Sequence, residues 1–244
     1  MKHDMIGQGA IVTGGARGIG RGIADRLIAE GCKVAVWDQD LSPLKTGQPQ
    51  PAFARQVDLT DLKAVEASFA ETLSAIGPVS IFVNNAGING PVMDSTEYPP
   101  DAWNRVIAVN LTAVFYCCRT VVPHMKERGY GRIVTVASIA GKEGMARIAA
   151  YSASKHGVIG YCKSLARELI GTGVLVNCVA PVITETDLFK EMTREHIDGA
   201  RAKIPMGRFL KIEEIAAMVA WIASPECSFT TGFTFDLSGG RADY

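Results

Sequence analysis

The sequence lacks the cysteine and histidine spacing of a metal site or a disulfide framework. None of its 6 cysteines forms a CxxC pair, and the residues beside them are mostly apolar. The 4 histidines show no metal-ligand spacing either. We therefore expect no catalytic metal. We also expect the cysteines to be reduced, buried thiols, as is typical of a cytoplasmic protein.

An excess of charge and a long apolar run are also lacking. Acidic and basic residues balance at 25 each, with no polybasic segment, so no nucleic acid partner is expected. The N-terminal stretch MKHDMIGQGAIV is too short and too polar for a signal peptide. Apolar stretches such as IAAMVAWIA are far shorter than the ~20 residues that cross a bilayer. These absences predict a cytoplasmic protein that has no membrane partner.

Short β-branched runs and longer helical patterns alternate along the chain, without an internal repeat or a linker. Continuous apolar strands separated by helices are typical of a parallel sheet covered on both faces. We therefore predict one α/β domain over residues 1–244, a Rossmann-type doubly wound parallel sheet with helices on both faces. The expected strands are 9–14, 33–38, 55–60, 79–87, 131–138, 174–181 and 232–240, and the expected helices are 16–32, 61–77, 101–129, 151–171 and 211–224.

A glycine-rich turn, TGGARGIG, joins the first strand to the first helix, with spaced glycines at Gly14, Gly18 and Gly20. Such a turn lets a pyrophosphate approach the free N–H groups at a helix N-terminus. The alternative is that it is only a tight turn. Its position between a strand and a helix favours a dinucleotide site.

Asp38 ends the second strand and is the candidate reader of the cofactor's ribose. A carboxylate there accepts hydrogen bonds from a ribose diol and repels a 2′-phosphate. Arg17 in the glycine loop argues the other way, because a cation there would meet that phosphate. We give Asp38 more weight and predict NAD as the cofactor. The alternative is that Asp38 only ends the strand.

The combination of TGGARGIG, NNAG at 84–87, Asn110, Ser138 and YSASK resembles the short-chain dehydrogenase/reductase family over essentially the whole chain. The resemblance implies a nicotinamide cofactor and reversible alcohol–carbonyl oxidoreduction. It also implies that NNAG stabilises the sheet near the cofactor, and that Asp58 and Leu59 contact the adenine. The catalytic positions that it implies are Asn110, Ser138, Tyr151 and Lys155. The cofactor contacts would be Gly14, Arg17, Gly18, Ile19, Gly20, Asp38, Asp58, Leu59, Asn85, Ala86, Gly87, Tyr151, Lys155, Pro181, Thr184 and Thr186.

One departure from the family pattern follows the sixth strand, in the stretch PVITET. Val182 stands where the family usually has glycine, and Thr184 stands where it usually has an aliphatic residue. Because valine lacks the backbone freedom of glycine, we expect this loop to hold the nicotinamide slightly differently.

The four catalytic side chains suit alcohol oxidation. Tyr151 and Lys155 are one helical turn apart on one face, and Ser138 ends a neighbouring strand. A phenol is normally protonated at neutral pH, so we expect Lys155 and the charged nicotinamide ring to favour the tyrosinate base. Ser138 would hold the substrate oxygen, and Asn110 would bind a water that links Lys155 to solvent.

Charged residues mark the expected substrate region. The segment between Ser138 and Tyr151 carries Lys142, Glu143 and Arg147, and the chain ends with Arg241 near Tyr244. Because arginine binds carboxylates bidentately, we hypothesise that Arg147 or Arg241, from this or a neighbouring subunit, binds a substrate carboxylate. The substrate-binding residues would then be Ser138, Arg147, Tyr151 and Arg241. The alternative is that both arginines are solvated or form subunit contacts.

The C-terminal third resembles the sugar-acid branch of the family, including enzymes that oxidise 2-keto-3-deoxy sugar acids such as 2-keto-3-deoxy-L-fuconate. The expected activity is NAD-dependent interconversion of a secondary alcohol and a ketone. One alternative is an NADPH-dependent 3-oxoacyl-[acyl-carrier-protein] reductase, and another is a nucleotide-binding protein without turnover. The family resemblance also implies a homotetramer, and the apolar run VIAVNLTAVFYCC is compatible with a subunit interface.

Overall fold

The computed structural model describes residues 5–46, 49–184 and 194–242 of the 244-residue chain. Its centre is a seven-stranded sheet with the strand order β3-β2-β1-β4-β5-β6-β7. Every neighbouring pair is parallel, as a doubly wound fold requires. The strands are β1 Gly9–Thr13, β2 Lys33–Asp38, β3 Phe53–Gln56, β4 Val79–Asn84, β5 Gly131–Val136, β6 Val174–Pro181 and β7 Thr234–Leu237.

The seven predicted strands are confirmed. β4, β5 and β7 are shorter than predicted and end at Asn84, Val136 and Leu237, and β3 is shifted along the chain. The sequence predicted this strand over 55–60, but it covers Phe53–Gln56. Its register is fixed by pairing with β2, where Ala35 lies opposite Phe53 and Asp38 lies opposite Gln56. The last ladder bond runs from Val57 N to Asp38 O, and the chain then leaves the sheet.

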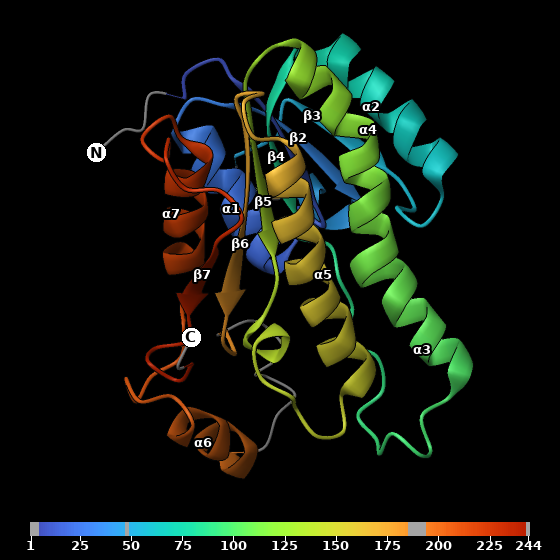
Figure 1. Ribbon diagram of the computed structural model, residues 1–244, viewed down its shortest axis with the longest axis vertical. Helices are drawn as coiled ribbons and strands as arrows, with labels where there is room; N and C mark the ends of the chain where they lie inside the picture. The colour runs from blue at the N-terminus through green and yellow to red at the C-terminus, as the bar shows by residue number, and fades with distance from the viewer. Residues whose placement is uncertain (1–4, 47–48, 185–193, 243–244) are drawn as a thin grey trace.

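Helices cover both faces of the sheet, as predicted (Figure 1). The helices α1 and α7 lie on one face, and α2, α4 and α5 lie on the other. The sequence reading missed the short helix α6. The bounds are α1 Gly18–Ala29, α2 Leu62–Ile76, α3 Pro100–Ile107, α4 Ala113–Glu127, α5 Ala149–Glu168, α6 Arg194–Ala202 and α7 Ile212–Ala223.

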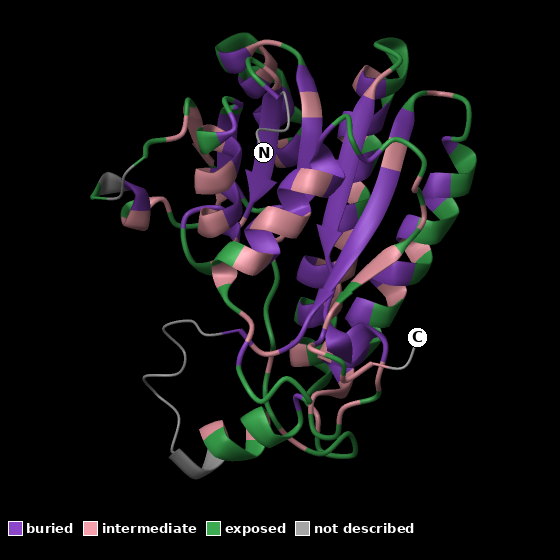
Figure 2. Ribbon diagram, turned by 90° about the vertical axis from the view of Figure 1, so that its left-hand side faces the viewer, coloured by how far each residue is buried: buried purple, intermediate pink, exposed green. Residues whose placement is uncertain are grey.

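Successive strand residues serve two separate cores, because side chains alternate across a sheet. Ile11, Phe82 and Ile133 pack toward α2, α4 and α5, whereas Val12 and Val83 pack toward α1 and α7. Figure 2 shows the strands buried along most of their length. The strand sequences are continuously apolar because both faces of the sheet are covered.

The predicted helix over 101–129 is interrupted by a π-helical turn, Ala108–Thr112, that separates α3 from α4. By length and composition alone, the run Pro100–Glu127 could cross a membrane, and 44% of its most apolar window is buried in the protein. It packs against α2, α5, β4 and β5. These contacts are those of a helix that covers a sheet.

The carboxyl ends of the strands meet at one edge, where doubly wound sheets bind ligands. Figure 1 shows the arrowheads of β6 and β7 pointing toward the end of the molecule that carries α6. The strand order reverses between β1 and β4, which places the glycine turn after β1 beside the NNAG segment after β4.

Candidate active site

The glycine turn has the backbone shape that the sequence predicted. Gly14 and Gly18 have positive φ angles of +62° and +57°, which are cheap only for glycine. A Cβ atom on Gly14 would lie 2.9 Å from the Cα of Ala86, and one on Gly20 would overlap the carbonyl oxygen of Gly14. Each of these positions therefore needs glycine, either for its φ angle or for a close approach.

The N-terminus of α1 is open to an anion. The helix begins at Gly18 with exposed Arg17 as its N-cap, and no side chain caps the first N–H groups. Its first turn contains no acidic residue. Free N–H groups and the helix dipole favour a phosphate there. Ile19 packs against the core, which anchors this turn.

Asp38 faces the glycine turn. Its Oδ2 atom accepts a hydrogen bond from Ala16 N at 3.0 Å, and its Oδ1 atom accepts one from Asp40 N at 3.2 Å. A hydrogen bond from Gly14 N to Trp37 O, at 2.7 Å, joins the glycine turn to the end of β2. Asp38 therefore lies beside the glycine turn, at the position where a carboxylate reads the ribose in dinucleotide-binding folds.

The NNAG segment is joined to β1 through Thr13, which the sequence reading did not single out. Asn85 N and Ala86 N donate to Thr13 Oγ1 at 3.0 and 3.1 Å. The Asn85 side chain donates to the carbonyls of Thr13 and Gly14. Thr13 could have been recognised in the sequence as the polar residue that ends the apolar run GAIVT.

The two proposed adenine contacts differ in exposure. Asp58 is exposed, and hydrogen bonds from the backbone and side chain of Thr60 hold the pKa of its carboxyl below the usual value. Arg105 lies 4.0 Å away. Leu59 is buried in the core on the α2 side.

Tyr151 and Lys155 lie on α5, one turn apart, as predicted. Lys155 is buried, and its Nζ atom donates to Val136 O at 2.8 Å. That atom is 5.6 Å from the centre of the half-buried Tyr151 ring. Lysine carries three N–H donors, so a bond to Val136 leaves donors for a cofactor hydroxyl and for water.

Asn110 belongs to the π-helical turn, a feature that often marks functional sites. Its Oδ1 accepts from Ile88 N at 2.8 Å, and its Nδ2 donates to Ile88 O and to Ser154 Oγ at 2.9 and 3.0 Å. A Cβ on Gly87 would lie 3.3 Å from Asn110 Oδ1 and 3.6 Å from Lys155 Nζ. Asn110 thus fixes α5 against the segment after β4 and keeps one Oδ1 lone pair for a water.

Ser138 follows β5 at the carboxyl edge and is largely buried. Its Oγ accepts a hydrogen bond from Ala140 N at 3.1 Å, at the start of the 3₁₀ turn Ile139–Gly141. That bond uses the oxygen as an acceptor. The O–H remains to be donated to a substrate oxygen.

The segment after β6 accommodates valine without strain. Pro181 ends β6, and Val182 N donates to Leu237 O at 3.2 Å. Val182 packs with Ile139 and Phe209, and the only non-glycine residue with positive φ in the described ranges is Arg147. The expected glycine freedom is therefore not needed at Val182.

Two predicted cofactor contacts belong to the same segment. Thr184 is buried, and its Oγ1 donates to Val182 O at 3.0 Å. It also forms an isolated bridge with Leu210. Thr186 lies outside the described residues.

The charged residues of the predicted substrate region form pairs within this chain. Arg241 donates to Glu143 Oε2 from Nε at 3.1 Å and from Nη2 at 2.7 Å. Lys142 Nζ lies 3.6 Å from Asp236 Oδ1. Arg147 Nε lies 3.6 Å from Asp94 Oδ1, and both of these side chains are well exposed.

The predicted burial of the cysteines is confirmed, since all six are buried. Cys118 lies beneath NNAG, where Asn84 Nδ2 approaches its Sγ at 3.5 Å. Burial raises the pKa of the Cys118 thiol to about 12. Among the described residues, no group of His, Cys, Asp and Glu could hold a metal ion.

Comparison with known proteins agrees with this geometry. The family model for short chain dehydrogenases matches residues 8–197. A 2-dehydro-3-deoxy-L-rhamnonate dehydrogenase (NAD(+)) of Sphingomonas sp. is 48% identical over 240 residues, which cover 98% of this chain and 96% of that protein. A 3-oxoacyl-[acyl-carrier-protein] reductase of Salmonella typhimurium is 38% identical over 237 residues, with coverage of 96% and 97%.

A solved structure has the same fold. The 3-ketoacyl-(acyl-carrier-protein) reductase from Brucella melitensis, complexed with NADH, superposes with a TM-score of 0.91 at 33% identity and covers 98% of this chain and 99% of its own. The fold, the glycine turn and the Tyr151–Lys155 pair agree with the matched family over most of the chain. This chain belongs to the short-chain dehydrogenase family.

Proposed function

We propose that this protein is an NAD-dependent dehydrogenase that oxidises a secondary alcohol of a sugar acid, of the 2-keto-3-deoxy class, to a ketone. The observation that carries the cofactor choice is the Asp38 carboxylate bonded to Ala16 N in the glycine turn. A 2′-phosphate placed there would meet a negative charge. The Sphingomonas relative, whose name specifies NAD and a 2-dehydro-3-deoxy sugar acid, supports both parts of the proposal.

The residues of the glycine turn and NNAG fit the dinucleotide. Its pyrophosphate would lie at the uncapped N-terminus of α1, and its ribose would be read by Asp38. When bound, NAD supplies the hydride acceptor. Further contacts with the cofactor are proposed from Arg17, Asp58, Asn85, Pro181 and Thr184. A contact from Thr186 is proposed from the sequence alone.

The catalytic residues then divide the work. Ser138 donates its O–H to the substrate oxygen and orients it. Tyr151, as tyrosinate, takes the hydroxyl proton, and the positive charge of Lys155 5.6 Å from its ring stabilises that anion. Asn110 holds α5 in place through Ser154 and Ile88 and offers a water site on the path from Lys155 to solvent.

The substrate carboxylate needs a cation on the same side of the sheet. Arg147 and Arg241 are the proposed receptors, from this chain or a neighbouring subunit, because guanidinium binds carboxylate through two parallel hydrogen bonds. Tyr151 and Ser138 would contact the reacting hydroxyl. The substrate is thus proposed as a small polar acid.

A second candidate is an NADPH-dependent 3-oxoacyl-[acyl-carrier-protein] reductase. It is favoured by the Salmonella relative and by exposed Arg17 at the N-cap of α1, where it could meet a 2′-phosphate. Asp38 argues against it. A protein that binds the nucleotide without turnover is disfavoured by the presence of all four catalytic residues.

We also propose one domain over residues 1–244, a cytoplasmic location and a homotetramer. A groove between α4 and α5 combines apolar and charged side chains, among them Phe115, Arg119, Tyr161 and Glu168. Phe115 is 43% exposed, and covering it in a subunit contact would remove apolar surface from water.

The experiment is to follow NAD and NADP reduction with a panel of 2-keto-3-deoxy acids, aldonates and matched neutral polyols. NAD reduction by an acid, with a much lower rate for its neutral analogue, is expected. Activity with polyols alone would remove the carboxylate from the proposal. The Tyr151→Phe variant is the background control.

A further inference from the structure

Two ion pairs join the turn after Ser138 to the C-terminal segment. Glu143 is held by Arg241 through Nε and Nη2, and Lys142 lies beside Asp236 on β7. The members of each pair are about a hundred residues apart in sequence, so the two segments meet only in the folded protein.

Both partners of the Glu143–Arg241 pair are fixed at their backbones. Glu143 N donates to Ile139 O at 2.9 Å, within the turn that begins at Ser138. Arg241 N donates to Ser238 Oγ at 3.1 Å, and Ser238 Oγ donates to Asp236 Oδ2 at 2.7 Å. The carboxylate of Glu143 is therefore held in a defined position relative to Ser138.

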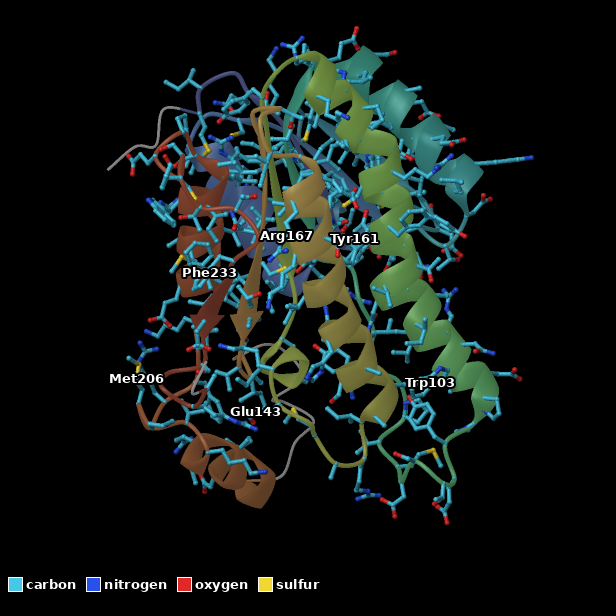
Figure 3. The ribbon with its side chains drawn as sticks, viewed as in Figure 1. Trp103, Glu143, Tyr161, Arg167, Met206 and Phe233 are labelled. Atoms are coloured by element: carbon cyan, nitrogen blue, oxygen red, sulfur yellow. The ribbon has the colours of Figure 1, made fainter. Side chains whose placement is uncertain are left out.

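The accessible end of the pair is the carboxylate. The Arg241 side chain is 17% exposed, and that of Glu143 is 31% exposed. Within the described residues, the two shorter bonds from Arg241 both go to Oε2, and Oε1 accepts one longer bond from Nε at 3.3 Å. A carboxylate oxygen accepts two hydrogen bonds, so Oε1 keeps acceptor capacity. Figure 3 places Glu143 beyond the arrowheads of β6 and β7, at the end of the molecule that carries α6.

We propose that Glu143, oriented by Arg241, accepts hydrogen bonds from substrate hydroxyl groups and so selects polyhydroxylated substrates. This inference rests on the proposed function, because it concerns the substrate of the same site. It assigns Arg241 to orienting Glu143 instead of binding the substrate carboxylate. Arg147 is then the cation for the carboxylate. Its side chain is 61% exposed and lies 3.6 Å from exposed Asp94.

The test compares two substrates in wild type and in Glu143→Gln. One is the best acid of the panel, and the other is its analogue in which every hydroxyl except the oxidised one is replaced by hydrogen. Hydrogen bonds to a charged group are strong enough that kcat/KM for the hydroxylated acid should fall roughly 10- to 100-fold. The analogue should change by less than about 3-fold, since it never used that bond.

A double variant, Glu143→Gln with Arg241→Gln, removes the pair without leaving one charge unpaired, and it should show the same selective loss. Glu214→Gln is the matched control, because Glu214 forms an equally close pair with Arg208 elsewhere on the surface. It should leave the ratio of the two kcat/KM values unchanged. NADH binding, measured by fluorescence, should be the same in all variants.

Two results would overturn the inference. An equal fall in kcat/KM for both substrates would mean that the Glu143–Arg241 pair only holds the two segments together. A lower KM for acids in Glu143→Gln would mean that Glu143 competes with the substrate for Arg241, the true carboxylate receptor. If wild type oxidises only neutral polyols, the proposed function fails, and a polyol with its deoxygenated analogue still tests Glu143.

Discussion

The two halves of the sheet's carboxyl edge are held by different kinds of interaction. The half after β1, β2 and β4 relies on glycines, backbone bonds and short side chains such as Thr13, Asn85 and Asp38. The half after β5, β6 and β7 relies on long charged side chains in pairs, such as Glu143–Arg241. We propose that the first half, called here the cofactor half, holds the dinucleotide. We propose that the second half, called here the substrate half, contacts the substrate.

The largest effect should come from the residue between the two halves. Tyr151→Phe removes the proposed proton acceptor and keeps the ring, so kcat should fall by a factor on the order of 10³, within the range for general base catalysis. NADH binding should weaken by less than about 10-fold, because at most one hydroxyl contact is lost. Stopped-flow kinetics and fluorescence titration check both. A kcat within tenfold of wild type would remove Tyr151 from the chemistry.

The rigidity of the cofactor half is tested by Gly14→Ala. The new methyl would combine a positive φ with a 2.9 Å approach to Ala86 Cα, so NADH binding should weaken at least about 10-fold, with a stability loss of about 1–3 kcal/mol. Gly7→Ala is the matched control, with a φ of +79° and no atom within 4 Å of its Cβ. It should lose stability and keep NADH binding. Equal NADH affinity in both variants would contradict the account.

Cofactor choice in the same half depends on Asp38. Asp38→Ala removes the acceptor for a ribose diol and the charge that repels a 2′-phosphate, so kcat/KM for NAD should fall about 10-fold and that for NADP should rise. Asp40→Ala, two residues along, should leave the NAD/NADP ratio as in wild type. An unchanged NAD/NADP ratio in Asp38→Ala would mean that another residue sets the cofactor preference, with Arg17 as the first candidate.

The smallest effect concerns a charged pair away from both halves. Hydrogen bonds from Arg208 and from Lys211 N lower the pKa of Glu214 from 4.5 to about 2. A lowered pKa means that the pair adds stability above pH 4.5 and loses it as pH falls toward 2. Because water and salt screen an exposed ion pair, Glu214→Gln should lower Tm by only a few degrees at pH 7.

The pH profile gives this prediction its control. The difference in Tm between Glu214→Gln and wild type should shrink as the pH is lowered toward 2. Glu213→Gln, a neighbour in the same first turn of α7, should show a smaller Tm difference at pH 7. A Tm difference for Glu214→Gln that is the same at pH 7 and pH 2.5 would contradict the assigned cause.

The shape of the glycine turn and the strands around it were predictable from the sequence, whereas the charged pairs after β5, β6 and β7 were not. Glycines after a strand and an acid at the end of the next are local patterns, and buried parallel strands appear in the sequence as apolar runs. The π-helical turn at Asn110 was hidden, because its apolar spacing continues that of the flanking helices. The bond between Glu143 and Arg241 joins residues 98 positions apart, which no local pattern reveals.

Two smaller differences have the same origin. The β3 strand begins two residues and ends four residues earlier than predicted, because pairing with β2 sets its register. Val182 needs no glycine-like backbone because Ile139 and Phe209 receive its side chain. Both depend on neighbours that the fold supplies.

The most direct test of the account is one pair of assays on the wild-type protein. The first follows NAD reduction by a 2-keto-3-deoxy sugar acid, and the second follows NADPH oxidation by an acetoacetyl thioester. We expect kcat/KM in the first assay to exceed that in the second by at least about 10-fold, equivalent to roughly 1.4 kcal/mol. Turnover only with NADPH and the thioester would contradict the roles given to Asp38 and to the charged substrate half.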